Sequence, residues 1–319
     1  MQKAQTEIRK TVVLEEVVVP QAPRILRVKS ERLHPATYII ESSSSLQILL
    51  KPWMVGADMA IHARESSTDF IRAVYQLVPE FRKASISSVA EVVPLAGALY
   101  YSLAEAFYNV FGETYNRCFI GARRQLTPKG WKTELSYKNF EALPPNPIVL
   151  IGDTIATGGT VEAIIKTTTD HAPDIQAILV YSIAGGLQGA IRLTELAKQL
   201  GIPFYCFYSN AIFGVEENGT DMPWLHPGTI ATVETLEMAE EAYGPDLGRR
   251  WCSIWDWGDR AKHPLKHLGE LLKRCDDELS SPIDDMTRVK LTSFRRETSD
   301  ALDHWHLPLS SSEGLPRMD

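Results

Sequence analysis

The chain has little of three features that would assign it to a special environment. Its four cysteines lie far apart in 319 residues and show no C-x-x-C spacing, so neither a disulfide framework nor a zinc site is expected. No apolar run approaches the ~18 residues that a membrane-spanning helix needs. Acidic residues outnumber basic ones, 40 to 33, for a formal net charge of −7. General affinity for nucleic acid or for anionic membranes is therefore not expected.

The rest of the composition is that of an ordinary globular protein. Apolar residues make up 44% of the chain, which is enough for a sizeable core. Charged residues interrupt the apolar runs of residues 1–20, and a signal peptide does not have that pattern. We therefore predict a cytoplasmic protein with reduced thiols.

Apolar segments of strand length alternate with amphipathic segments of helix length in the middle of the chain. This alternation predicts an α/β fold with a mainly parallel sheet and flanking helices. In such a sheet, ligands bind beyond the carboxyl ends of the strands. The expected strands are 88–95, 118–122, 148–152, 175–183 and 203–208, and the expected helices between them are 99–110, 160–170 and 189–200.

Changes in composition divide the chain into four parts. Residues 1–45 contain short extended segments and are expected to form an N-terminal arm or hairpin outside the main fold. Residues 46–262 are expected to form the main domain, with an insertion at about 223–250, and a small hood or acceptor subdomain is expected beside the sheet. Residues 263–303 are expected to be C-terminal helices, and 304–319 a tail.

The segment 148–160 is the most informative one. The apolar run Ile148–Ile151 ends at Gly152 and Asp153, and T-I-A-T-G-G-T then leads into a helical pattern. Backbone N–H groups at a helix N-terminus bind phosphate, and glycine lets the backbone approach closely. Threonine hydroxyls would add donors, and Asp153 would accept from sugar hydroxyls. The alternative is an ordinary strand-to-helix turn, although the pattern is neither a Walker loop nor G-x-G-x-x-G.

A second polar segment, Gly121–Lys138, is strongly basic. It carries five Lys or Arg residues, including Arg123 and Arg124, against the single acid Glu134. Such a charge run is typical of a solvated loop, and equally of a loop that contacts an anion.

The 148–160 segment resembles the phosphoribosyl pyrophosphate (PRPP) loop of type I phosphoribosyltransferases. Further segments, in the right order between about Met59 and Arg260, resemble motifs of uracil phosphoribosyltransferases. They are His62–Arg72 ("LRD…TS…FR"), Val93–Gly97 (the pyrophosphate loop), Ile120–Arg124 with Tyr137 ("IG-x-x-R…YY"), Phe213–Gly219 ("D-Q-G-L-N-E-x-G") and Trp255–Arg260 ("G-D-A-G-D-R").

The resemblance implies an enzyme that transfers phosphoribose from PRPP, with Mg²⁺, to an acceptor with release of pyrophosphate. It implies a homodimer and an oxocarbenium-like transition state, so that catalysis comes from positioning and charge stabilisation. Most of the Mg²⁺ ligands would be substrate oxygens and water, with Asp256 as the protein contribution. The implied PRPP contacts are Asp153, Thr154, Ala156, Thr157, Gly158, Gly159, Thr160, Arg123, Arg124, Ala96 and Gly97. The implied acceptor contacts are Ile254, Trp255, Asp256, Trp257 and Gly258, and the catalytic residues are Asp153, Asp256 and Arg124.

The sequence departs from the family at three places. Gly152 stands where the family has an acidic residue, and Leu95 stands where its pyrophosphate loop has an arginine. The glycines of the uracil loop are replaced by serine and tryptophan after an insertion of about thirty residues. Because a tryptophan beside the pocket suits a large aromatic acceptor, uracil itself is less expected.

Several alternatives remain open. The clustered tryptophans are also typical of core packing, Asp256 and Asp259 of helix caps, and His263 with His267 of a solvated helix face or a metal pair. Because of Gly152 and Leu95, a non-catalytic PRPP- or nucleotide-binding regulatory protein is the second hypothesis. An enzyme that uses the phosphoribosyl group in another reaction is the third.

Overall fold

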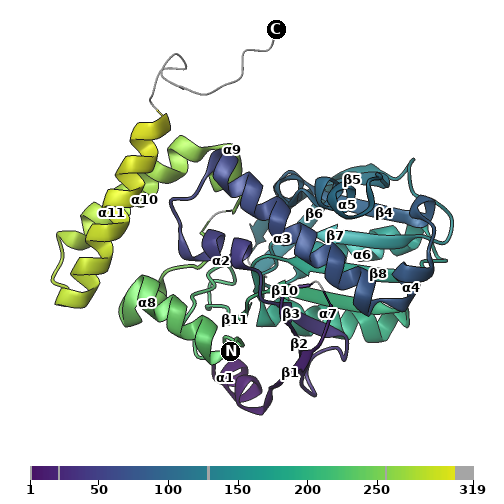
Figure 1. Cartoon of the computed structure of the whole chain (residues 1–319), viewed down its shortest axis with the longest axis horizontal. Coiled ribbons are helices and arrows are strands. Elements are labelled where there is room, and N and C mark those ends of the chain that lie inside the picture. The colour runs from purple at the N-terminus through teal and green to yellow at the C-terminus, as the bar shows by residue number, and fades with distance from the viewer. Residues whose placement is uncertain (1, 21, 128–129, 256, 306–319) are drawn as a thin grey trace, which may run out of the picture.

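The computed structural model describes residues 2–20, 22–127, 130–255 and 257–305 (Figure 1). Within these ranges, every helix is too short or too polar to cross a lipid bilayer.

The core of the protein is one nine-stranded sheet in the order β1-β2-β3-β10-β8-β7-β4-β5-β6. From β3 to β5 in this order, neighbouring strands are parallel, and antiparallel strands are added at both edges. The predicted class, α/β with a mainly parallel sheet and flanking helices, is confirmed. The strands are β1 (Val13–Val17), β2 (Ile25–Lys29), β3 (Thr37–Ile40), β4 (Val89–Leu95), β5 (Asn116–Thr127), β6 (Gly130–Asn139), β7 (Ile148–Gly152), β8 (Ala177–Ser182) and β10 (Phe204–Ser209); β9 (Gly185–Gly186) pairs with β11 (Ile212–Phe213).

Helices cover both faces of the sheet, so its central strands are buried. Along β7, Ile148 and Leu150 belong to one apolar cluster, whereas Val149 and Ile151 belong to the other, as the alternation of a strand requires. The first cluster includes side chains of α3 (Gly56–Leu77), which crosses in front of the sheet in Figure 1, and of α5 (Leu103–Phe111). The second includes side chains of α6 (Gly159–His171) and α7 (Leu187–Leu200).

The N-terminal segment is part of the sheet. Residues 1–45, expected to form an arm outside the main fold, contribute β1, β2 and β3, and β3 pairs with β10 deep in the sheet. Ile25, Ile39 and Ile40 are fully buried there. The β1–β2 pair is antiparallel and belongs to this sheet, and α1 (Gln2–Thr11) precedes it. Because an isolated pair of short strands is only marginally stable in water, β1 and β2 are stabilised by joining the larger sheet through β3.

The remaining helices surround this core or extend from it. In the expected insertion, α8 (Val233–Arg250) is interrupted by Gly244, whose φ is 74°. The C-terminal helices α10 (Pro264–Leu279) and α11 (Asp285–Trp305) lie side by side away from the sheet (Figure 1). The other elements are α2 (Ser43–Leu50), α4 (Pro79–Lys83), η1 (Ile86–Ser88), η2 (Gly97–Tyr101) and α9 (Trp257–Lys262).

Candidate active site

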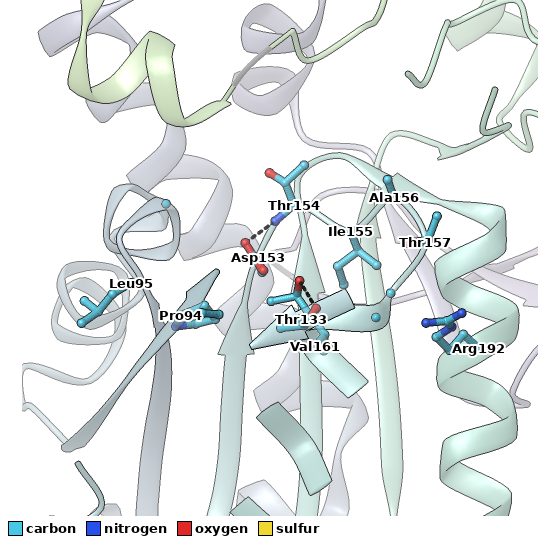
Figure 2. Close-up of a pocket in the computed structure, with 15 residues that line it drawn as sticks. Pro94, Leu95, Thr133, Asp153, Thr154, Ile155, Ala156, Thr157, Val161 and Arg192 are labelled. Carbon is cyan, nitrogen blue, oxygen red and sulfur yellow. Dashed lines mark hydrogen bonds between the residues drawn. The ribbon is translucent and has the colours of Figure 1, made fainter. Parts of the chain in front are cut away.

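A cavity of about 420 Å³ lies at the carboxyl ends of the central strands, as expected for this class of sheet (Figure 2). It is lined by Pro94 and Leu95 at the end of β4, by Gly97 after it, by Ala122 and Thr133 of β5 and β6, by residues 153–161, and by Arg192. The whole predicted phosphate loop, Asp153 to Thr160, is part of this lining.

The loop is fixed by backbone hydrogen bonds to the neighbouring β8–α7 connection. The N–H of Asp153 donates to Tyr181 O at 3.1 Å, and the N–H of Ile155 donates to Ala184 O at 3.1 Å. The N–H of Gly189 in turn donates to Ala156 O at 3.0 Å. The loop is therefore held in shape without a ligand, which lowers the entropic cost of binding one.

Glycine is required where the loop becomes a helix. Gly158, the N-cap of α6, has a φ of 77°, and a Cβ built on it would lie 3.0 Å from the Cα of Gly189. The first intrahelical bond of α6 runs from Glu162 N to Gly158 O. The preceding N–H groups of the helix have no intrahelical acceptor, and they border the cavity. An anion in the cavity would therefore meet backbone donors and the positive end of the helix dipole.

Asp153 is the one acidic side chain among the fifteen residues drawn in Figure 2. Its Oδ1 accepts from the N–H of Thr154 at 2.9 Å, which holds the half-buried carboxylate at the start of the loop. The site thus places a carboxylate at the strand end and phosphate-type donors at the helix start. A sugar phosphate has matching groups, because its hydroxyls can donate to the carboxylate and its phosphate can accept from the donors of the helix start.

The place of the missing acidic residue is filled by other side chains. A Cβ on the buried Gly152 would lie 2.9 Å from Cδ1 of Leu103 and 3.2 Å from Cδ1 of Tyr101. The hydroxyl of Tyr101 lies 3.2 Å from Oγ1 of Thr154 and accepts from the N–H of Ile183 at 3.3 Å. Burial, together with the charge of Asp153, raises the pKa of Tyr101, so the phenol stays neutral.

The basic segment Gly121–Lys138 is a β-hairpin, formed by most of β5 and β6, where we expected a polar loop. Oγ1 of Thr133 lies 3.3 Å from Oγ1 of Thr160, so the hairpin contacts the start of α6. Arg123 is exposed and is not among the lining residues. The side chain of Arg124 lies outside the described part of the structure.

The segment Val93–Gly97, expected to be a pyrophosphate loop, forms the end of β4 and the two residues after it, and it borders another side of the cavity. Leu95 and Gly97 line it, whereas Ala96 between them is exposed, and the Leu95–Ala96 peptide is cis. The O of Gly97 accepts from Nε1 of Trp257 at 3.0 Å. Trp257 is buried with its ring centroid 4.9 Å from that of Tyr101, so it joins α9 to the margin of the cavity.

None of the four predicted acceptor residues that the structure describes (Ile254, Trp255, Trp257 and Gly258) is among the residues that line the cavity. The ring of Trp255 packs against Trp251 at 5.0 Å and lies under the guanidinium of Arg274 at 5.0 Å, so it faces the C-terminal helices. This is the core-packing alternative. Ile254 is buried, Gly258 is half-buried in α9, and Asp256 lies outside the described residues.

The chemistry of the donors fits Mg²⁺ only as an ion that the substrate brings with it. In the described ranges no group of three His, Cys, Asp or Glu side chains could hold a metal. His267 has its Nε2 2.7 Å from Pro52 O. Asp153 offers a carboxylate in the cavity, and Mg²⁺ readily takes one protein carboxylate together with substrate phosphates and water.

Arg192 is a site residue that the sequence reasoning missed. It lies in the second turn of α7, 32 residues after the end of the loop at Thr160, yet its side chain reaches the cavity (Figure 2). The signal that could have indicated it is topological. Consecutive crossover helices on one face of a parallel sheet lie side by side, and this brings the start of α7 beside that of α6.

The fold overlaps solved phosphoribosyltransferase structures. Adenine phosphoribosyltransferase of Trypanosoma brucei, in complex with AMP, pyrophosphate and ribose-5-phosphate, has a TM-score of 0.37 at 10% identity, over 56% of this chain and 84% of that chain. The hypoxanthine-guanine enzyme of L. donovani has 0.34 at 14%, over 57% and 96%. Adenine phosphoribosyltransferase of Saccharomyces cerevisiae has 0.32 at 12%, over 65% and 99%.

No protein-family model matches the chain, and no curated protein matches it. The scores and identities of the structural overlaps are low, so they assign neither a substrate nor a residue role.

Proposed function

We propose that the protein is a Mg²⁺-dependent phosphoribosyltransferase that transfers 5-phosphoribosyl from PRPP to an aromatic acceptor, uracil-like or larger. One observation carries this proposal. Asp153 and the glycine-rich start of α6 belong to one loop and line the same cavity, so that a carboxylate and phosphate-type backbone donors face one ligand space. An ordinary strand-to-helix turn needs neither the carboxylate nor the cavity.

In the proposed reaction, the bond between ribose C1 and the pyrophosphate oxygen breaks, and its electron pair leaves with pyrophosphate. A nucleophilic atom of the acceptor forms the new bond to C1 and loses its proton. Residues 157–160 would bind the 5′-phosphate, and Asp153 would accept from a ribose hydroxyl. Mg²⁺, when bound, supplies charge neutralisation at the pyrophosphate. We assign Arg123, Arg124, Ala96 and Gly97 to the pyrophosphate side and Asp256 to Mg²⁺ as proposals.

The acceptor is proposed to enter beside Trp257. This assignment is supported by the hydrogen bond from Trp257 to Gly97, a residue of the cavity lining. Ile254, Trp255 and Gly258 would then act by holding the loop against the C-terminal helices. A cytoplasmic homodimer is proposed from the resemblance, and sedimentation of the purified chain tests its dimeric state.

The test is pyrophosphate release from PRPP and Mg²⁺ in the presence of a panel of nucleobases and aromatic acids. At least one acceptor is expected to give release that depends on both the acceptor and the protein, and chelation of Mg²⁺ is expected to stop it. Binding of ribose 5-phosphate without turnover of any acceptor would contradict catalysis but not the phosphate site.

Asp153→Asn is expected to lower kcat/KM for PRPP about 10- to 100-fold, because a hydrogen bond to a charged group becomes a neutral one. The fold should be preserved, since an Asn Oδ1 can still accept from the N–H of Thr154. Steady-state kinetics measures the effect. Asp170→Asn, on an exposed position of α6, is the matched control and should change nothing. Equal kcat/KM values for the two variants would remove Asp153 from the ribose site.

Tyr101→Phe is expected to lower the free energy of unfolding by about 1–2 kcal/mol, because the buried N–H of Ile183 loses its acceptor. Affinity for ribose 5-phosphate should fall a few-fold, since Thr154 loses a neighbour that orients it. Urea unfolding and calorimetry measure the two effects. Tyr108→Phe, at a position 58% exposed, should leave both values unchanged. A loss of stability with unchanged affinity would limit Tyr101 to a structural role.

A second candidate function is a non-catalytic PRPP- or nucleotide-binding regulatory protein. It is favoured by the apolar Leu95 and by the filled position 152, which together leave the cavity with few charges. Calorimetry distinguishes the two functions. A regulatory protein would bind nucleoside monophosphates as tightly as PRPP and would release no pyrophosphate.

A further inference from the structure

We propose that Arg192 binds the 5′-phosphate and thereby makes a phosphomonoester a requirement for binding; this inference rests on the proposed phosphoribosyl site. Arg192 comes from α7, outside every motif that predicted the site. It is the one basic side chain among the described residues that line the cavity. Figure 2 shows its guanidinium reaching from α7 toward the end of the loop.

The guanidinium lies beside the first residue of α6. A Cβ built on Gly159 would lie 2.9 Å from Nη1 of Arg192. Because Gly158 and Gly159 have no side chains, nothing at these two positions separates the guanidinium from the backbone donors of the helix start. A phosphate held by those donors would be within reach of Arg192. The glycines therefore allow Arg192 to approach the helix start, in addition to allowing the turn into the helix.

In the structure without ligand, the partner of Arg192 is weak and replaceable. Nη1 lies 3.6 Å from Oε2 of Glu162, and both side chains are partly exposed. Glu162 also pairs with Lys166, one turn further along α6, at 2.7 Å. If Arg192 turns to a phosphate, Glu162 keeps Lys166 and no buried charge is left unpaired. The exchange therefore costs little, since exposed ion pairs contribute about 0–1 kcal/mol.

Arginine suits a phosphate better than lysine does at this place. Its planar fork can donate two parallel hydrogen bonds to phosphate oxygens, whereas an ammonium acts as a point charge. The backbone donors of α6 would bind one side of the phosphate and Arg192 another. Ribose without its phosphate would contact neither group. Discrimination between ribose and ribose 5-phosphate would therefore arise at this end of the cavity.

The experiment is calorimetric titration of the full-length chain with ribose 5-phosphate. We expect Arg192→Gln to weaken binding about tenfold or more, and Arg192→Lys to weaken it less. Lys198→Gln is the matched control, because Lys198 is an exposed base of the same helix paired with Glu195. It should leave the affinity unchanged. In kinetics, Arg192→Gln should raise KM for PRPP with little change in kcat.

A second variant tests the exchange of partners. Glu162→Gln should tighten ribose 5-phosphate binding several-fold in the natural chain, and by much less when Arg192 is already Gln. Equal affinity of natural chain and Arg192→Gln would overturn the inference and leave the proposed function standing. If the natural chain binds neither ribose 5-phosphate nor PRPP, the inference and the proposed function both fail. Unchanged circular dichroism spectra and unfolding midpoints confirm that the variants are folded.

Discussion

Restoring an acidic side chain at position 152 should lower the free energy of unfolding by about 3 kcal/mol or more. A resemblance-based design would make Gly152→Asp to recover the family's carboxylate and to raise activity. The structure leads to the opposite expectation. The Cβ of an aspartate at position 152 would lie 2.9 Å from Cδ1 of Leu103, and its carboxylate would be buried beside apolar side chains next to Asp153. Urea unfolding measures the loss.

Two further variants separate the causes of that loss. Gly152→Ala adds only the Cβ, so its cost should be about 1–3 kcal/mol, the range of overpacking. In the background Leu103→Ala, which opens space, the same Gly152→Asp change should cost less than in the natural chain. An unchanged unfolding midpoint for Gly152→Asp, with increased turnover of PRPP, would contradict this account. It would mean that the position retains the function of the family's acid.

The central part of the fold was predictable because its signals are local. A parallel strand buried on both faces is a continuous apolar run, and β7 and β8 are such runs. The helix that follows β7 has its own apolar period. The loop between them was predictable because glycine and threonine at those spacings have few other uses. Each of these signals lies within about a dozen residues.

The parts that could not be predicted depend on partners far away in the chain. The N-terminal strands look like an isolated arm until Cys206–Ser209 of β10 is placed beside β3. The hairpin formed by β5 and β6 extends beyond the expected strand 118–122. In β6, Trp131, Leu135 and Tyr137 alternate with polar residues, but the many basic side chains of this segment favoured a loop. Arg192 and Trp255 show the same limit at the level of side chains. Arg192 reaches the cavity because α7 lies beside α6, whereas Trp255 turns away from the cavity and packs against Trp251.

Position 152 and the residues around it show how an atypical loop keeps its shape. Where the family would have a carboxylate, this chain has Leu103 and the ring of Tyr101. The hydroxyl of Tyr101 is within hydrogen-bond distance of Oγ1 of Thr154, the residue after Asp153. A contact within the protein thus occupies the place where the resemblance implies a contact with the substrate. Asp153 is then the carboxylate on which the proposed ribose contact depends.

Arg260→Met should lower the free energy of unfolding by about 3–5 kcal/mol. Arg260 ends the motif that resembles the uracil loop, yet it is fully buried and its guanidinium donates to main-chain carbonyls. The acceptors are Ile48 O at 3.2 Å, Lys51 O at 2.9 Å, Met54 O at 2.8 Å and Ile254 O at 3.2 Å. Burial lowers the pKa of Arg260 to about 10, which leaves it charged at neutral pH. Methionine fills similar space but donates to none of these oxygens.

The same variant decides between a structural and a binding role for this arginine. Arg249→Met, at an exposed position of α8, is the control and should stay within about 0.5 kcal/mol of the natural chain. Because Arg260 fixes α2 against α9, which carries Trp257, loss of stability should come with a modest loss of acceptor turnover. Affinity for ribose 5-phosphate, whose proposed phosphate site lies at the start of α6, should remain. Full stability with abolished turnover would instead place Arg260 in contact with the substrate.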